Sequence, residues 1–332
     1  MSYKLDLRMW KLVRAISESL SISEISRKTG IPKATVWRKI NEMFSKTRIR
    51  FVVSSKALRL KPLVVIFDKE PSQLPTYTIS FRKINISGKP AYMVIGLVPE
   101  KYVADYLLLF DIDPLLFIEG EEKTIWKPSL SEKYKVLSLI NGELLVNYDI
   151  LKKIKEKPSK KEPCKLDIYD LYIIKWKENY AFVSLTDIYL HALKEGIKAS
   201  RQLLSYHYRK HVLPMWIGNA IGLYRPTIEY PFRVFIYECS DAEELAFKLS
   251  LIPYIYTIYY SKDTLFFVGQ PSVKEIYELY SKVLKDHSPR PLICETYVDP
   301  SLVRFIIKYH KLWNKDWIKP KIAYKVETRQ NR

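Results

Sequence analysis

The sequence predicts an α+β fold in which one arrangement of helices and strands occurs twice. Each half opens with a similar dipeptide, Leu5-Asp6 and Leu166-Asp167, which is followed by an apolar-periodic helix and then by a second, shorter helical pattern. Apolar runs typical of strands then alternate with amphipathic helical patterns. Self-similarity on this scale indicates an internal duplication.

The end of the second half shows the most regular pattern. Strands are expected at 232–238, 254–260, 264–269 and 292–296, and helices at 241–250 and 272–285. This is the β-α-β-β-α-β order of a ferredoxin-like module. The first half shows a similar series, with a strand at 91–97, a helix at 100–110, strands near 115–119 and 123–127, and an extra pair of apolar runs at 63–67 and 77–84.

Charge is segregated along the chain, which has 332 residues and a net charge of +19. Residues 1–60 contain fourteen Lys or Arg and only four Asp or Glu, whereas residues 61–150 are slightly acidic. The stretch 151–165 has seven lysines and two prolines, which indicates a basic linker. Cations confined to particular modules are expected of a protein that binds a polyanion.

Residues 22–43 carry the pattern of a helix-turn-helix. Ile25 lies on the buried face of a short helix, Gly30 supplies the turn, and Val36 and Ile40 continue the buried face on a second helix. The side chains left facing outward are hydrogen-bond donors and cations, suited to the major groove: Lys33, Thr35, Trp37, Arg38 and Lys39. The alternative is an ordinary helical packing unit with a solvated basic face, and Trp37 could equally pack on a wing or on a neighbouring domain.

Two further basic elements extend this interpretation. Residues 47–54 are expected to form a wing strand whose Arg48 and Arg50 meet the phosphate backbone, unless they simply solvate an edge strand. The second half holds a degenerate counterpart, with Gly196 in the place of Gly30. Its following helix offers the second set of candidate DNA contacts, for which a structural role or partner docking is the alternative: Lys198, Ser200, Arg201, Gln202, His207, Arg209 and Lys210.

The first of these patterns resembles the helix-turn-helix of the Lrp/AsnC (feast/famine) transcription regulators. The residues that carry the resemblance are Ser23-Glu24-Ile25, Gly30-Ile31 and Thr35-Val36, with Arg38 and Ile40. The resemblance implies a DNA-binding head joined to a ferredoxin-like domain that dimerises through its sheet. This chain departs from the family because it is expected to hold two of each, and it has no glycine-rich loop between strands.

The expected domain boundaries follow from these patterns. They are a helix-turn-helix domain with a wing at 1–60, a ferredoxin-like module at 61–150, a linker at 151–165, a second helix-turn-helix at 166–225, a second module at 226–303, and a basic C-terminal helix and tail at 304–332.

No pattern for catalysis or cofactor binding is found. His207 and His211 are four residues apart, a spacing that can chelate a metal, but no neighbouring Cys, Asp or Glu in the sequence completes a site. Walker, GxGxxG, nucleophile-elbow and zinc-deaminase motifs are absent from the sequence. We therefore expect neither enzymatic activity nor a cofactor or metal.

The sequence thus predicts a transcription regulator that binds specific double-stranded DNA through the helix around 32–43. A cytoplasmic protein without a membrane partner is expected, since no long apolar run, signal core or cysteine framework is found. A homodimer and a small-molecule effector are both compatible with the sequence. The alternatives are a nucleic-acid-processing or accessory factor in replication, recombination or transposition, and a general chromatin- or RNA-binding protein.

Overall fold

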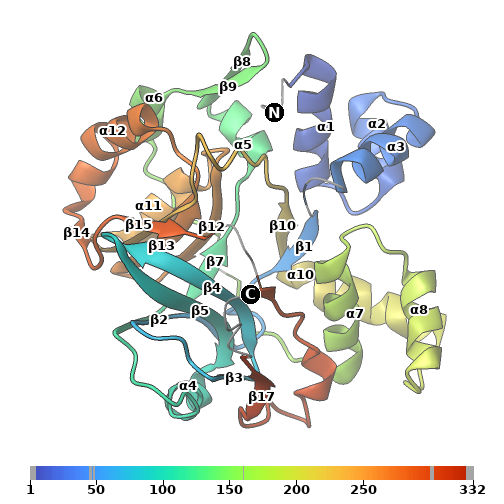
Figure 1. Ribbon diagram of the computed structural model, residues 1–332. Coiled ribbons are helices and arrows are strands. Elements are labelled where there is room, and N and C mark those ends of the chain that lie inside the picture. Colours follow the sequence, from blue (N-terminus) through green and yellow to red (C-terminus); the bar gives the residue numbers. More distant parts are fainter. Residues whose placement is uncertain (1–4, 45–46, 48, 160, 300–302, 327–332) are drawn as a thin grey trace.

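The computed structural model describes residues 5–44, 47, 49–159, 161–299 and 303–326. The chain folds into a mixed α+β structure of helices and antiparallel sheets, and an N-terminal helical region precedes the strands (Figure 1). None of the helices in this described part has the length and apolar character that crossing a membrane requires.

The N-terminal region consists of α1 (Leu7–Ser17), α2 (Ile22–Thr29), α3 (Lys33–Phe44) and the strand β1 (Arg50–Val53). The Asp6 side chain caps α1 by accepting the Met9 N–H, and Ser21 caps α2 in the same way. Gly30 ends α2 at a φ of +70°, a left-handed conformation that favours glycine. These helices and this turn lie where the sequence predicted them.

A second helical region has the same order of elements. It comprises α7 (Ile168–Asn179), α8 (Leu185–Lys194), α9 (Arg201–His207), the π-helical turn η2 (Tyr208–Val212), α10 (Leu213–Met215) and the strand β10 (Trp216–Ala220). We call residues 5–53 the first head and residues 167–220 the second head. The two heads lie on one side of the molecule, and β1 pairs with β10 between them to form a two-stranded antiparallel ribbon (Figure 1).

The rest of the chain is built on one large antiparallel sheet. Its first half contains β2 (Leu60–Phe67), β4 (Thr78–Ile86), β5 (Lys89–Pro99) and β6 (Leu116–Glu119), in the spatial order β6-β2-β5-β4. Its second half contains β11 (Arg233–Glu238), β12 (Ile255–Tyr260), β13 (Thr264–Gly269) and β15 (Thr296–Val298), in the order β15-β11-β13-β12. The halves join where β4 pairs with β15.

The sheet closes on itself through one kinked segment. β6 lies at one end of the strand order and β7 (Glu122–Thr124), which pairs with β12, lies at the other, yet only Gly120 and Glu121 separate them in the chain. The Gly120 N–H donates to Pro62 O at 2.8 Å and the Glu121 N–H to Tyr260 O at 2.8 Å. Closure leaves little free edge and gives both halves a shared interior core. This core includes Val64, Ile66, Met93, Ile118, Ile236, Phe266 and Val268.

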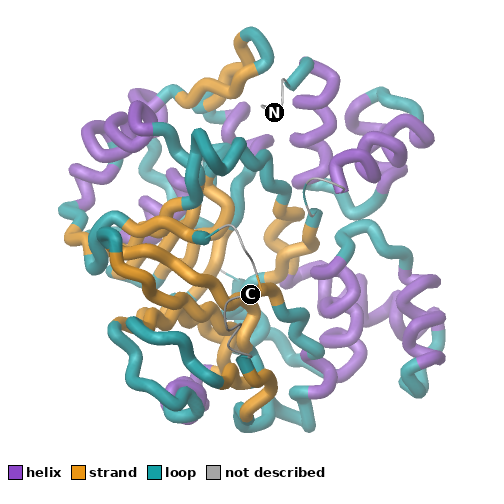
Figure 2. The backbone as a smooth tube through the Cα atoms, viewed as in Figure 1, coloured by secondary structure: helices purple, strands orange, loops and turns teal. Residues whose placement is uncertain are grey.

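Helices and short strands cover the outside of this sheet (Figure 2). The second half is covered by α11 (Ala242–Leu249), α12 (Val273–Lys282) and α6 (Tyr148–Lys153), which share an apolar core with β12 and β13. The outer face of the first half shares its core with both heads. The remaining elements are β3 (Gln73–Pro75), α4 (Val103–Leu107), α5 (Pro128–Lys133), β8 (Leu137–Ile140), β9 (Glu143–Val146), β14 (Arg290–Pro291), β16 (Val303–Arg304) and β17 (Ile322–Lys325).

The structure corrects the expected strand order of the first half. The series expected to begin at 91–97 actually begins at β2, and the two runs treated as extras are β2 and β4, the neighbours of β5. The segment between β2 and β4 holds the short β3 instead of a helix. In the second half the last strand lies at 296–298, displaced from the expected 292–296.

The C-terminal segment is also corrected. A basic helix was expected in 304–332, but the described residues up to 326 form the end of β16, a 3₁₀ turn at Tyr309–Lys311 and β17, which pairs with β3. Aromatic burial explains this conformation: the Trp317 Nε1–H donates to Leu58 O at 2.9 Å, and the Tyr77 hydroxyl donates to Ile318 O at 2.6 Å. The segment is anchored to the first half of the chain by these contacts.

The expected linker packs against the second half. Ile154 is buried, and two of the lysines pair with the start of α11, Lys155 with Glu244 at 3.3 Å and Lys157 with Asp241 at 2.9 Å.

Glu122 fixes the connection between the first head and the closed sheet, and replacing it tests this junction. Its buried carboxylate accepts the Ser55 N–H at 2.8 Å and the hydroxyls of Ser54 and Ser55, which are themselves buried. Glu122→Gln places an amide against these donors, so we expect the free energy of unfolding to fall by about 2–3 kcal/mol. Urea denaturation measures the change. Glu121→Gln, at the exposed neighbouring position, should change it by less than about 0.5 kcal/mol; equal effects of the two variants would contradict the assignment.

Candidate nucleic-acid interface

The first head exposes the predicted face of α3. Lys33, Trp37 and Arg38 are exposed, Thr35 and Lys39 are half-exposed, and Val36 and Ile40 are buried on the opposite side. Trp37 is 57% exposed, so it is not part of the head's core. Lys39 pairs with Glu42 at 2.9 Å and Arg38 lies 4.0 Å from the same carboxylate. Such exposed pairs contribute little, so both cations can still be attracted to a polyanion.

The second head exposes most of its predicted residues as well. Lys198 and Ser200 precede α9, and the Ser200 hydroxyl caps this helix by accepting the Leu203 N–H. The exposed side chains continue onto η2 and, with the start of α8, line a surface hollow of about 770 Å³. The residues that line it are Leu185, Thr186, Arg201, Gln202, Ser205, Tyr206, Arg209 and Lys210.

Three predicted residues are placed differently or lie outside the described part. His207 was expected on the exposed face but is buried, with its Nδ1 2.9 Å from the Asp170 carboxylate. Arg50, expected to contact phosphates as part of a wing, is half-buried and lines a cavity beneath the ribbon. Arg48 lies outside the described residues.

The ribbon holds the two heads together. Phe51 of β1 stacks on Trp216 of β10 with ring centroids 5.7 Å apart, and Arg50 lies opposite Ala220. Asn219 is buried and its side-chain amide donates to Ile16 O at 2.8 Å and to Ser19 O at 2.7 Å, both at the end of α1. A residue of the second head thus completes the hydrogen bonding of the first.

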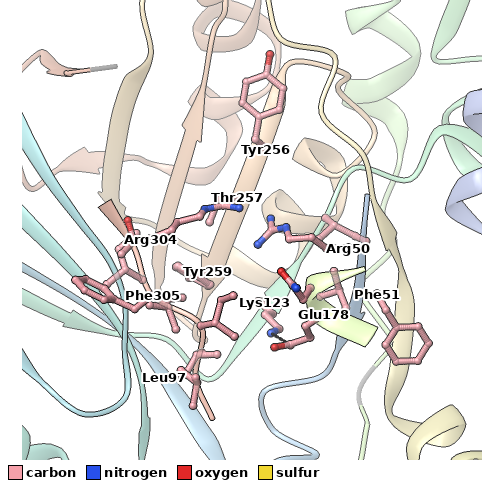
Figure 3. Close-up of a pocket in the computed structure, with 18 of the residues that line it drawn as sticks. Arg50, Phe51, Leu97, Lys123, Glu178, Tyr256, Thr257, Tyr259, Arg304 and Phe305 are labelled. Carbon is pink, nitrogen blue, oxygen red and sulfur yellow. Dashed lines mark ion pairs between the residues drawn. The ribbon is translucent and has the colours of Figure 1, made fainter. Parts of the chain in front are cut away.

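A cavity lies between the ribbon and the sheet. It consists of two adjoining hollows, of about 150 and 340 Å³. In Figure 3, Arg50 reaches from β1 into this space toward Thr257 and Tyr259. The residues common to both hollows are Arg50, Arg82, Ile95, Tyr256, Thr257 and Arg304.

The electrostatics of this cavity are dominated by cations. Burial, and to a smaller extent the neighbouring Arg50, lowers the pKa of Arg82. Burial likewise lowers the pKa of Lys123, whose ammonium lies 3.8 Å from the Glu178 carboxylate. The sequence analysis did not find Arg82, Lys123 or Arg304, because they come from strands far apart in the chain and no local motif joins them.

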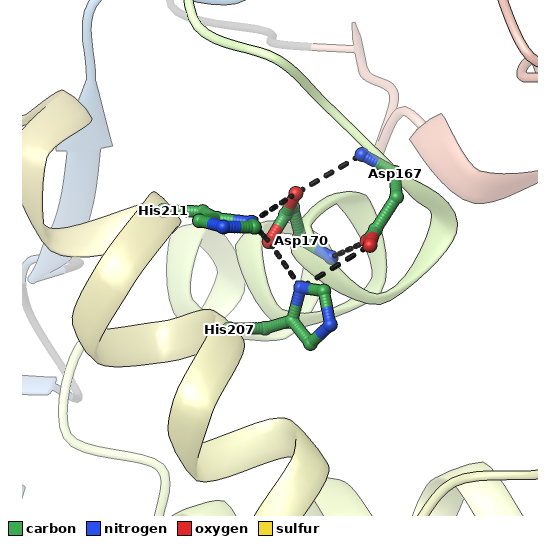
Figure 4. A group of neighbouring side chains, drawn as sticks. All are labelled: Asp167, Asp170, His207 and His211. Atoms are coloured by element: carbon green, nitrogen blue, oxygen red, sulfur yellow. Dashed lines mark hydrogen bonds and ion pairs between the residues drawn. The ribbon is translucent and has the colours of Figure 1, made fainter.

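A cluster of possible metal ligands lies inside the second head (Figure 4). Asp167 and Asp170, at the start of α7, lie beside His207 and His211, and one ligand atom of each falls within 4.8 Å of the others. The sequence analysis found no Asp that could complete a site with the two histidines, but the fold brings two beside them. The neighbours come from a helix 37 to 44 residues earlier, which sequence spacing could not show. Burial is the largest influence on Asp170 and raises its pKa.

Comparisons of this chain with protein-family models, with curated proteins and with solved structures find no match. The functional interpretation therefore depends on the geometry of the chain itself.

The Asn219 contact predicts how strongly the heads are coupled. Asn219→Asp keeps the shape of the side chain but places a carboxylate against two carbonyl oxygens, so we expect the free energy of unfolding to fall by about 2–4 kcal/mol. Asn219→Ala only removes the amide donors, so it should lower the free energy of unfolding by less than Asn219→Asp does. Chemical denaturation measures both, and hydrogen exchange should show faster exchange in β10 and at the end of α1. The contact would be unimportant if Asn219→Asp unfolded at the wild-type urea concentration.

Proposed function

We propose that this protein is a transcription regulator that binds specific double-stranded DNA with two unlike winged helix-turn-helix heads in one polypeptide. The observation that carries the proposal is the pairing of two helical regions with the same element order, each with an exposed basic helix, through the β1–β10 ribbon. Lrp/AsnC-like regulators, which the first head resembles in sequence, bring two heads together by dimerisation. Here one chain would supply both.

The charge distribution supports DNA as the partner. The first sixty residues have a strong excess of Lys and Arg, and α3 exposes Lys33 and Arg38 beside the apolar Trp37. Contacts of cations with phosphates would supply affinity that falls with salt, and a guanidinium such as that of Arg38 can read guanine in the major groove.

The strand orders support an internal duplication. In each half of the sheet the main strands, numbered along the chain, lie in the spatial order 4-1-3-2, which is the order of a ferredoxin-like module. The first module would have lost its first helix, whose place is taken by the β3 segment. Two such modules joined in one closed sheet would hold the two heads at a fixed separation.

The two heads are expected to recognise different sequences. Lys33, Thr35 and Arg38 occupy the exposed face of the first head, whereas Arg201 and Gln202 occupy that of the second. These side chains differ in their donors and acceptors, so the two half-sites on DNA should not be identical. A single chain would then protect an asymmetric site.

A footprinting experiment tests whether each head recognises its own half-site. Sites are first selected from random duplexes with the full chain and then protected with wild type and variants. Arg38→Ala should weaken specific binding by about 1–3 kcal/mol and remove protection from one half-site, and Arg201→Ala should act on the other half only.

Lys89→Ala provides the control, because this exposed lysine lies at the turn between β4 and β5, away from both heads. If all three variants lost the same affinity for specific and for random DNA, the binding would be explained by general charge attraction alone. Protection of a perfect palindrome would mean that two chains pair through their first heads. Magnesium-dependent nicking of the selected duplex would favour a nucleic-acid-processing enzyme over a regulator.

A further inference from the structure

The cavity beneath the ribbon gathers cations from four strands that are far apart in the sequence. Arg50 comes from the first head, Arg82 and Arg304 from β4 and β16, and Lys123 from β7. Among the described lining residues Glu178 is the one carboxylate, and it already pairs with Lys123 and accepts the Tyr309 hydroxyl at 2.9 Å. Neither Arg50 nor Arg82 has a carboxylate of the described residues within 4.0 Å. Half-buried guanidinium groups that repel one another are stabilised when an anion lies between them.

The same cavity has an aromatic wall. Tyr224, Phe232 and Tyr256 form a cluster with ring centroids 4.9 to 5.9 Å apart, and all three line the larger hollow. The position of Tyr256 is fixed because its hydroxyl donates to Leu223 O at 3.1 Å or Gln270 Oε1 at 3.0 Å. The volume of the larger hollow, about 340 Å³, falls within the range of small-molecule binding sites. Cations and aromatic rings that line the same cavity match a ligand with a phosphate end and a flat apolar end.

We propose that this cavity binds a small phosphorylated ligand of the nucleotide type, with its phosphates on Arg50 and Arg82 and its base on the Tyr224–Tyr256 wall. The ligand would contact β1 on one side and strands of the sheet on the other. It would therefore tie the first head and the ribbon to the sheet, and removing it would loosen the spacing of the heads. The binding site stands by itself, whereas its effect on DNA rests on the proposed function.

Calorimetric titration of the full chain, free of DNA, tests the binding site. ATP and inorganic pyrophosphate are the probes, and we expect saturable binding of one molecule per chain, with ATP tighter than pyrophosphate because of its base. Arg82→Gln and, separately, Arg50→Gln should each weaken ATP binding at least tenfold. Lys83→Gln is the matched control, since Lys83 is the exposed neighbour on β4 and loses the same charge.

Two results would overturn the proposal: no saturable binding of either probe, or equal weakening by Lys83→Gln and Arg82→Gln, which would indicate general attraction to a basic protein. Binding that survives when sequence-specific DNA binding fails would leave the site in place and refute only its regulatory role. Binding of pyrophosphate and ATP with equal affinity would refute the aromatic part of the site.

An independent observation carries a second proposal, at the His–Asp cluster of the second head. His207 Nδ1 lies 2.9 Å from Asp170 Oδ1 and 3.2 Å from Asp167 Oδ2, and His211 Nδ1 lies 3.1 Å from Asp170 Oδ1. Ligand atoms around a tetrahedral zinc ion are separated by roughly 3.3 Å, given zinc–ligand bonds of about 2.0 Å. Both imidazoles thus present the same nitrogen to one point, and a π-helical turn, a feature often found at functional sites, begins between them at Tyr208.

The charge and exposure of the cluster also fit a cation. Asp170 is fully buried beside Asp167, and neither carboxylate has an ion pair with a Lys or Arg of the described residues. The side chains of Asp167 and His211 are 40% and 32% exposed, which leaves a path for an ion to enter. We infer that the cluster binds a divalent transition-metal ion such as Zn²⁺, which would fasten α9 and η2 to the start of α7.

Cobalt titration of the full chain tests this site, because Co²⁺ in a low-symmetry site of this kind absorbs visible light. We expect one equivalent to bind with a visible band that Zn²⁺ abolishes. His211→Ala and Asp167→Asn, which keeps a capping side chain on α7, should each weaken binding at least tenfold. His191→Ala, on α8 of the same head, is the control. No band, or the same band in His211→Ala, would show that the four side chains are only a hydrogen-bonding network.

Discussion

The pairing of β1 with β10 is the interaction on which the arrangement of the two heads depends. The two strands are more than 160 residues apart in sequence, yet their backbones form one ribbon with Arg50 opposite Ala220. The Phe51–Trp216 stack covers one side of it, and Asn219 reaches across to the carbonyl groups at the end of α1. Without this ribbon the two heads would lose the backbone pairing that joins them directly, and the first head would keep only its core contacts and the Glu122 junction with the sheet.

The ribbon in turn depends on the closed sheet beneath it. Glu122, in the segment that closes the sheet, binds the serines that follow β1, so the position of the ribbon and the closure of the sheet are fixed together. The arginine-lined cavity lies at this junction, between β1, β10 and the sheet. A ligand there could influence the heads without touching DNA, because it would contact the elements that position them.

The sequence predicted those features whose causes are local. Asp6, Ser21 and Gly30 start or end helices through contacts within three or four residues, and these helices are found where they were expected. The second half of the sheet was also predicted, except for its last strand. Local patterns could not predict which strands are neighbours in the first half. β2 pairs with β5 although about twenty residues separate them, and this pairing depends on which apolar faces pack together in the fold.

The candidate sites show the same limit. The exposed face of α3 follows from helical periodicity, since Val36 and Ile40 mark its buried side. His207 was predicted as a DNA contact on the helix that follows Gly196, but a buried carboxylate, Asp170, approaches from α7 and pairs with it. The cations of the cavity lie on four strands and none is close to another in sequence. Such sites are formed by the tertiary fold and leave no local pattern.

The central claim is that one polypeptide presents both DNA-binding heads. Its most direct test is the stoichiometry of the complex with a selected duplex, measured by sedimentation velocity at protein concentrations well above the dissociation constant. The ribbon-linked heads predict one chain per duplex, with the same stoichiometry when the duplex is in excess. A complex of two chains on each duplex, formed cooperatively and lost when the site is cut to half its length, would contradict the claim.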